Sequence, residues 1–230
     1  MGRESTKLVN DICKRKKAWS NHHVPTAIEI DQLLQKTDYK TTIITCTRRG
    51  TRIINSLCVQ VLFRNRNEKP IGNIQADYEA NDDNYDPQTQ KLKDCVPVPE
   101  ALDIYIGLRI VTTKNRNKKN DSVNGMTATV SGHNEETNAL LVLTQTGKHV
   151  SIYLYTDDDV PKGRVTYYPV RVGYANPLHK FQGAELEHVT LWLDRPGSPA
   201  AAYVALSRVK KDTDYLIGGV VTPGHFTPAR

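Results

Sequence analysis

The strongest constraint on the fold is a repeated sequence pattern. In each repeat, a short run of residues typical of a β-strand is followed by residues typical of the start of a helix. Val170, Val172 and Tyr174 alternate as in a strand, and Asn176 and Pro177 follow as a helix cap and first helical residue. Strands that alternate with helices predict a parallel sheet. Ligands of such sheets bind in the crevice beyond the carboxyl ends of the strands.

The same order recurs further along the chain. Residues 188–193 predict a buried strand, and Ser198 and Pro199 repeat the cap-plus-proline signal. Residues 200–209 then predict a short alanine-rich helix, and residues 214–217 a closing strand.

The N-terminal region adds another unit of this kind. Residues 8–19 predict a short basic helix, and the apolar residues up to position 35 are compatible with a second helix. Residues 41–46 form a β-rich run, and the apolar positions of residues 53–62 follow helical spacing.

The middle of the chain has a different pattern. Residues 65–99 are polar and acidic, which indicates a surface excursion or a partly disordered insertion. Residues 103–113 alternate as one strand. Further short β-rich runs between Gly, Asn and Asp turns suit a small barrel, and they cover 126–130, 139–143, 150–154 and 165–168. Asp157 and its two acidic neighbours fit a solvated turn, so we assign no metal ligand.

Charge and composition favour a polyanionic partner. The chain has 230 residues, a formal charge of +6 and a pI near 9.1. Basic residues cluster at 14–17, 48–52 and 114–119, and acidic ones between 77 and 94. Composition alone leaves open that these runs are only solvated faces.

The sequence also predicts a soluble, intracellular protein, nuclear or cytoplasmic. Its four cysteines form no C-x-x-C pair, which argues against zinc and for reduced thiols. No apolar run approaches the ~20 residues of a membrane span. The first residues lack the apolar core of a signal peptide.

Two short motifs suggest a family. Residues 179–185, H-K-F-Q-G-A-E, and residues 203–208, Y-V-A-L-S-R, resemble motifs V and VI of superfamily 1 helicases, in the branch with the RecD-like and PIF-like families. Residues 44–49 with Asn55 resemble motif IV of the same helicases. Residues 107–130 resemble the start of the small barrel that these proteins carry in the second motor domain.

The resemblance implies an α/β fold: a RecA-like parallel-sheet domain of the P-loop NTPase type, the second motor domain, with an inserted small SH3-like β-barrel. We expect an N-terminal helical segment at 1–40 and the first part of the motor domain, with a polar insertion, at 41–100. The barrel would cover 101–168, and the remainder of the motor domain 169–230.

The resemblance also implies roles for residues near ATP. Arg208 would be the arginine finger that stabilises the charge of the transition state, and Arg48 would reach the phosphates from the same side. Gln182 and Gly183 would lie at the nucleotide edge, and Glu185 would accept a hydrogen bond from the ribose hydroxyl.

Other residues are candidates for contact with single-stranded DNA. His179 would stack or hydrogen-bond, and Lys180 would bind a phosphate. Lys114 and Asn115, in the basic loop of the expected barrel, join them as candidates. Pro177 stands where relatives commonly have a threonine, and Phe181 where they have a small serine, which suggests that Phe181 packs beneath the turn.

The sequence contains no G-x-x-x-x-G-K-[ST] phosphate loop and no acidic Mg²⁺ motif after a hydrophobic strand. ATP with Mg²⁺ would therefore need a first RecA-like motor domain, from the same gene or a partner. We interpret the chain as the C-terminal half of an ATP-dependent DNA helicase, moving 5′ to 3′ and inactive alone. The alternatives are a non-enzymatic nucleic-acid-binding module and an interaction protein that uses its acidic segment.

Overall fold

The computed structural model describes residues 3–20, 24–80, 101–115, 124–158, 163–181, 186–195 and 198–227. The chain divides into two compact units. Unit 1 contains Met1–Asn67 and Gly173–Arg230, and unit 2 is the intervening Glu68–Val172. Along the described part of the chain, no helix is both long and apolar enough to cross a membrane.

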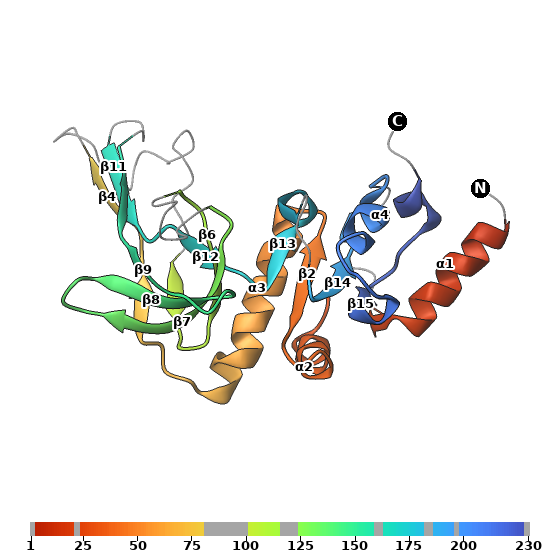
Figure 1. The fold of residues 1–230 in the computed structure, drawn as a ribbon, viewed down its shortest axis with the longest axis horizontal. Helices are drawn as coiled ribbons and strands as arrows, with labels where there is room; N and C mark the ends of the chain where they lie inside the picture. Colours follow the sequence, from red (N-terminus) through yellow and green to blue (C-terminus); the bar gives the residue numbers. More distant parts are fainter. Residues whose placement is uncertain are drawn as a thin grey trace. The chain divides into compact units, whose positions relative to one another are not determined.

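Unit 1 is built on a five-stranded sheet in which every pair of neighbouring strands is parallel. This arrangement confirms the prediction of a parallel sheet with helices (Figure 1). In spatial order the strands are β1 (Lys17–Trp19), β15 (Tyr215–Gly218), β14 (His188–Trp192), β2 (Thr41–Thr45) and β13 (Ala175–Pro177).

Helices cover both faces of this sheet. Alternate residues of a strand point to opposite faces, so neighbours on β2 serve different cores. Ile44 packs in a cluster with α1 and α4, whereas Thr45 bonds Thr51 of α3 across 2.7 Å on the other side. Among the described residues of unit 1, the α-helices are α1 (Arg3–Arg15), α2 (Ala27–Lys36), α3 (Arg48–Leu62) and α4 (Ala201–Leu206).

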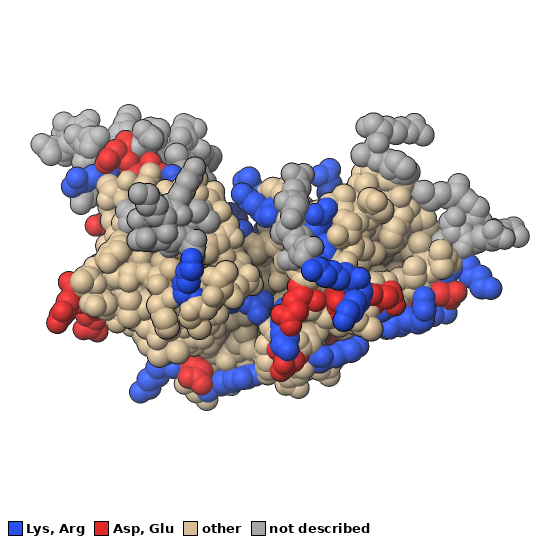
Figure 2. Space-filling view, viewed as in Figure 1, with Lys and Arg blue, Asp and Glu red and all other residues tan. Residues whose placement is uncertain are grey.

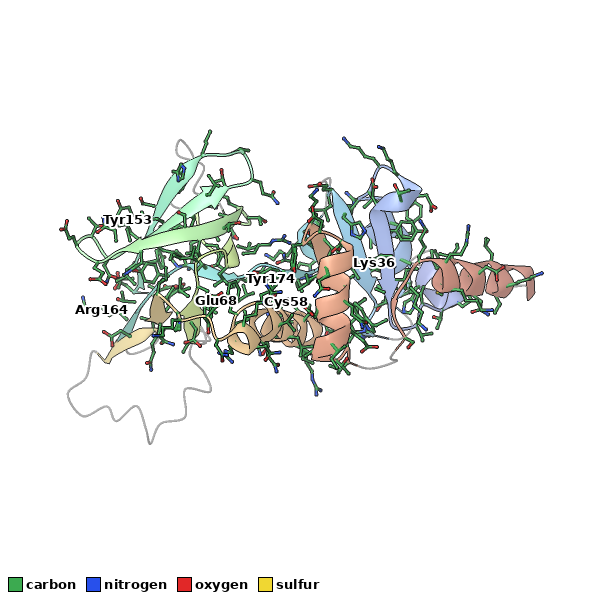
Figure 3. The ribbon with its side chains drawn as sticks, turned by 90° about the horizontal axis from the view of Figure 1, so that it is seen from below. Lys36, Cys58, Glu68, Tyr153, Arg164 and Tyr174 are labelled. Carbon is green, nitrogen blue, oxygen red and sulfur yellow. The ribbon has the colours of Figure 1, made fainter. Side chains whose placement is uncertain are left out.

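Helix α3 lies beside the edge strand β13. Cys58, which is fully buried, lies on α3, and Tyr174 directly precedes β13 (Figure 3). The amide of Asn55 bonds the main chain of Ala175 twice: Nδ2 donates to the carbonyl at 3.1 Å, and Oδ1 accepts from the N–H at 2.8 Å. These bonds satisfy the groups that an edge strand would otherwise leave open.

Unit 2 is an all-β structure in its described part, apart from short turns. Its largest sheet is antiparallel, with the order β12 (Val170–Val172), β6 (Arg109–Thr112), β7 (Thr127–Asn134), β8 (Ala139–Thr144) and β9 (His149–Tyr153). A second sheet contains β10 (Tyr155–Asp157), β11 (Gly163–Tyr167) and β4 (Asp77–Ala80). A two-stranded ladder joins β3 (Gly72–Ile74) and β5 (Leu102–Ile104).

The run from Val170 to Tyr174 is not one strand, contrary to the prediction. β12 pairs with β6 in unit 2, and β13 pairs with β2 in unit 1. Asn176 and Pro177 therefore belong to a strand and not to a helix cap, and the segment after them is the 3₁₀ helix η3 (Leu178–Phe181). An edge strand tolerates Pro177 because one side of the strand needs no donor.

Three other local predictions are also wrong: the end of the N-terminal helix, the cap of α4 and the continuity of the strand at residues 103–113. The N-terminal helix stops at Arg15, because the next residues form β1 beside β15. Ser198 does not cap α4: the cap position is Ala200, in a left-handed conformation with no side-chain bond. The alternating run 103–113 is broken by a turn at Gly107, whose φ of 83° favours glycine.

Residues 72–74 and 77–80, within the segment expected to be a surface excursion or a partly disordered insertion, form the strands β3 and β4, so disorder is wrong for them. Residues 81–99 of that prediction lie outside the described residues. These strands were not predicted because their side chains are mostly polar. A short strand at the edge of a sheet can form without a regular alternation of apolar and polar residues.

Candidate functional site

The candidate site of unit 1 lies at the carboxyl edge of its parallel sheet. Pro177 of β13 and Trp192 of β14 are both in register with Thr45 of β2, so these three strands end together. The next residues in each case carry the polar groups of interest. This is the edge where ligands of parallel sheets bind.

Arg48 is the first residue of α3, and its side chain is exposed. Thr47 caps this helix, because its hydroxyl accepts from Gly50 N at 2.9 Å. The first turn contains Arg48 and Arg49 and no acidic residue. Cations are unfavourable beside the positive end of a helix dipole, so local helix stability does not explain them.

Asp194, which the sequence analysis missed, meets the same turn from the loop after β14. Its Oδ1 accepts from Cys46 N at 2.7 Å and from Thr47 N at 3.1 Å, and its Oδ2 accepts from the Thr47 hydroxyl. A polar residue directly after a buried strand, at the carboxyl edge of a parallel sheet, was the available signal. Burial raises the pKa of the neighbouring Cys46 thiol, which disfavours the thiolate.

The loop with Asp194 is held from the C-terminal side by His225. Its imidazole is buried, Nδ1 accepts from Thr222 N at 3.0 Å, and Nε2 therefore donates to Arg195 O at 3.1 Å. These two bonds specify one neutral tautomer. His225 thus fixes the loop that carries Asp194.

The segment that resembles motif V continues from β13 into η3. His179 and Lys180 are exposed on η3, whereas Phe181 is partly buried and packs against the core with Leu178. The prediction that Phe181 packs beneath the turn is confirmed. Gln182, Gly183 and Glu185 lie outside the described residues.

Arg208 lies just beyond the end of α4. Its Nε donates to Val204 O at 3.1 Å, one turn back along the helix, and the side chain is partly buried. Its carbonyl accepts from Leu186 N at 3.0 Å. The residue that follows the motif V segment is therefore joined directly to the motif VI segment.

Lys114 and Asn115 lie in unit 2, whereas the residues described above lie in unit 1. Lys114 Nζ pairs with Asp157 Oδ2 at 3.0 Å and lies 4.8 Å from the Tyr155 ring centre. The bond to Asp157 raises the pKa of this ammonium. Asn115 Oδ1 accepts from Asn124 N at 2.7 Å.

Asp157 itself corrects a prediction. It is buried in β10 and paired with Lys114, so a solvated turn is wrong for this residue. Its neighbour Asp158 is exposed.

The donor set at the carboxyl edge fits phosphate oxygens better than a metal ion. Arg48, Lys180 and Arg208 are cations, which suit a nucleotide phosphate or DNA. Within the described ranges, no group of three or more His, Cys, Asp or Glu side chains gathers as metal ligands would. Basic and acidic side chains are interspersed over the face shown in Figure 2.

Comparison with known proteins gives no match to a family model. The ATP-dependent DNA helicase Pif1 of Bdellovibrio bacteriovorus is 26% identical over 175 residues, which are 74% of this chain and 39% of that protein. The crystal structure of Pif1 helicase from Bacteroides in complex with ADP-AlF3 and ssDNA superimposes with a TM-score of 0.62 at 20% identity. It covers 100% of this chain and 52% of that one.

Pif1 helicase from Candida albicans superimposes with a TM-score of 0.66 at 18% identity, over 97% of this chain and 52% of that one. The chain thus spans about half of the solved structures and about two fifths of the curated relative. The chain is thus similar to Pif1 helicases in sequence, at 26% identity, and in fold.

Proposed function

We propose that this chain is the second motor half of an ATP-dependent DNA helicase that moves 5′ to 3′ on single-stranded DNA. One observation carries the proposal. The segments that resemble motifs IV and V leave adjacent parallel strands at the same edge of one sheet, and the motif VI segment is bonded to the end of motif V.

In this proposal Arg208 and Arg48 act on the nucleotide. Hydrolysis of ATP spreads negative charge over the transferred phosphoryl group, and a guanidinium from a second domain stabilises that charge. Bound ATP and Mg²⁺ would supply the reacting phosphate and its charge neutralisation. The phosphate loop and the Mg²⁺-holding acid would come from the first motor domain, since neither motif occurs in this sequence.

His179 and Lys180 form the DNA-contacting part of unit 1 in this proposal. Both are exposed on a 3₁₀ turn at the sheet edge, where an imidazole can stack on a base and an ammonium can bind a phosphate. Lys114 forms an ion pair with the buried Asp157, which favours a role of Lys114 in stabilising the fold. Lys180 is therefore the stronger candidate for contact with DNA.

We assign unit 2 to the inserted SH3-like barrel of this family. Its short antiparallel strands and tight turns at Gly107, Gly125 and Gly147, all with positive φ, support the assignment. Lys114 and Asn115 would then order the start of its basic loop through their bonds to Asp157 and Asn124.

The decisive experiment is ATP hydrolysis by the chain alone and after joining a Pif1-type first motor domain, each with and without single-stranded DNA. We expect no hydrolysis by the chain alone and DNA-stimulated hydrolysis by the joined protein. Arg208→Ala should lower kcat by about a thousandfold or more, with a smaller effect on ATP affinity. Lys211→Ala, an exposed cation three residues away, is the matched control and should retain full activity.

The main rival is a non-enzymatic nucleic-acid-binding module derived from a helicase. It predicts that the affinity for DNA is the same with and without nucleotide and does not change in the Arg208→Ala variant. Hydrolysis in the joined protein that survives Arg208→Ala would instead refute the arginine-finger role.

A further inference from the structure

The first turn of α3 contains no acidic residue. The N-terminal N–H groups of a helix attract anions, and acidic residues usually occupy the first turn. Here that turn contains Arg48 and Arg49 instead. The missing carboxylate comes from Asp194, which is distant in sequence and follows β14.

Gly50 makes this contact sterically feasible. A Cβ atom at Gly50 would lie 2.1 Å from Asp194 Oδ2, far below any real contact distance. The glycine φ is not positive, so backbone conformation does not require it there. The residue is therefore explained by the space that the Asp194 carboxylate occupies.

We propose that Asp194 is a positioning residue for Arg48. Its carboxylate binds the main chain on the N-terminal side of α3 and the hydroxyl of the cap Thr47, and so fixes the turn from which Arg48 projects. The carboxylate occupies the N–H groups of Cys46 and Thr47, which precede the helix, and the Thr47 hydroxyl occupies that of Gly50. The inference rests on the proposed role of Arg48 toward ATP.

The contact itself is tested by thermal unfolding of the full chain. Glycine-to-alanine changes inside a helix normally stabilise it. Gly50→Ala should instead lower Tm by a few degrees, because the new methyl group expels the carboxylate. In the Asp194→Ala background the same change should raise Tm. A rise in Tm in the wild-type background would show that the contact does not exist and would overturn the inference.

Positioning is tested by steady-state kinetics of the joined protein. Asp194→Ala should lower kcat by about ten- to a hundredfold, since a small displacement of a catalytic group has effects of that size. Asp194→Asn, which keeps an acceptor oxygen, should recover most of the loss. The Arg48→Ala, Asp194→Ala double variant should be no slower than Arg48→Ala alone, because both changes remove one interaction.

Glu29→Ala is the matched control. Glu29 caps α2 through Thr26 N and Thr26 Oγ1, at 2.9 and 3.0 Å, so its loss should lower Tm without changing kcat. If Asp194→Ala behaves like Glu29→Ala while Arg48→Ala slows hydrolysis, Asp194 is only a helix cap and this inference fails alone. If Arg48→Ala leaves kcat unchanged, the proposed role of Arg48 fails and this inference fails with it.

Discussion

At the scale of single residues, Asn55 shows how one side chain joins two elements. Its amide replaces the missing neighbour of the edge strand β13 by bonding both polar groups of Ala175. The sequence that resembles motif IV includes this asparagine, and in the structure its side chain holds α3 against β13 through these two hydrogen bonds. Asn55 is buried, so removing its amide leaves two main-chain groups without this partner.

We therefore predict that Asn55→Leu lowers the free energy of unfolding by about 2–4 kcal/mol, since each unsatisfied buried group costs about 1–3 kcal/mol. Urea denaturation of the full chain measures the change. Ser56→Ala, at an exposed neighbouring position, should stay within about 0.5 kcal/mol of wild type. Equal stability of the two variants would contradict this role of Asn55.

At the scale of elements, Gly218 decides how β1 joins the sheet. Trp19 of β1 is buried over Gly218 of β15, and its ring meets Trp192 edge-on with centroids 6.2 Å apart. A Cβ at Gly218 would lie 2.2 Å from the Trp19 ring. The ring is rigid and enclosed, so it has little freedom to move aside.

Gly218→Ala should accordingly destabilise the chain by about 1–3 kcal/mol through overpacking. Gly72, in β3, is the matched control, since a Cβ there would have no neighbour within 4 Å. Gly72→Ala should be neutral or slightly stabilising in the same urea titration. A neutral Gly218→Ala would mean that Trp19 does not pack as described.

The start of β14 carries a pH-sensitive residue. Burial lowers the pKa of His188, against the opposing charges of Asp214 and Glu187, and its Nδ1 lies 2.9 Å from Thr41 Oγ1. The unfolded chain then binds a proton more readily than the folded one. Stability should therefore be fully present above the ordinary histidine pKa of about 6.5 and decline as the pH falls below it.

Urea midpoints measured on either side of that pH, for wild type and His188→Gln, test this expectation. The variant should lose part of the decline toward acid, because it has no imidazole to protonate. An identical decline in both proteins would assign it to other groups.

At the scale of the whole molecule, the proposed binding to single-stranded DNA should weaken steeply with salt. Each neutralised phosphate releases counterions and adds about −0.7 to the slope of log K against log salt. Lys180→Ala should reduce the steepness by about that amount. Fluorescence anisotropy with a labelled oligonucleotide measures both slopes.

Lys36 provides the control for that measurement. It ends α2, just before β2 begins, whereas Lys180 follows the carboxyl end of β13, which runs parallel to β2. Lys36 therefore belongs to the opposite edge of the sheet from Lys180. Lys36→Ala should leave the slope unchanged. An equal effect of the two lysines would indicate nonspecific attraction to the basic protein and would argue against a DNA track at the carboxyl edge.

The amino-acid sequence by itself predicted a parallel sheet with helices in unit 1 and a likeness to superfamily 1 helicases. The spacing of apolar residues that indicates a strand or a helix is a local property of the sequence. Motif residues can likewise be compared with those of a family without a structure. Only the tertiary structure decided that β12 and β13 serve different units, and that Asp194 stabilises the start of α3. Both depend on which distant segments meet. The hydrogen-bond partners of a strand or a helix end come from such contacts, and local sequence does not encode them.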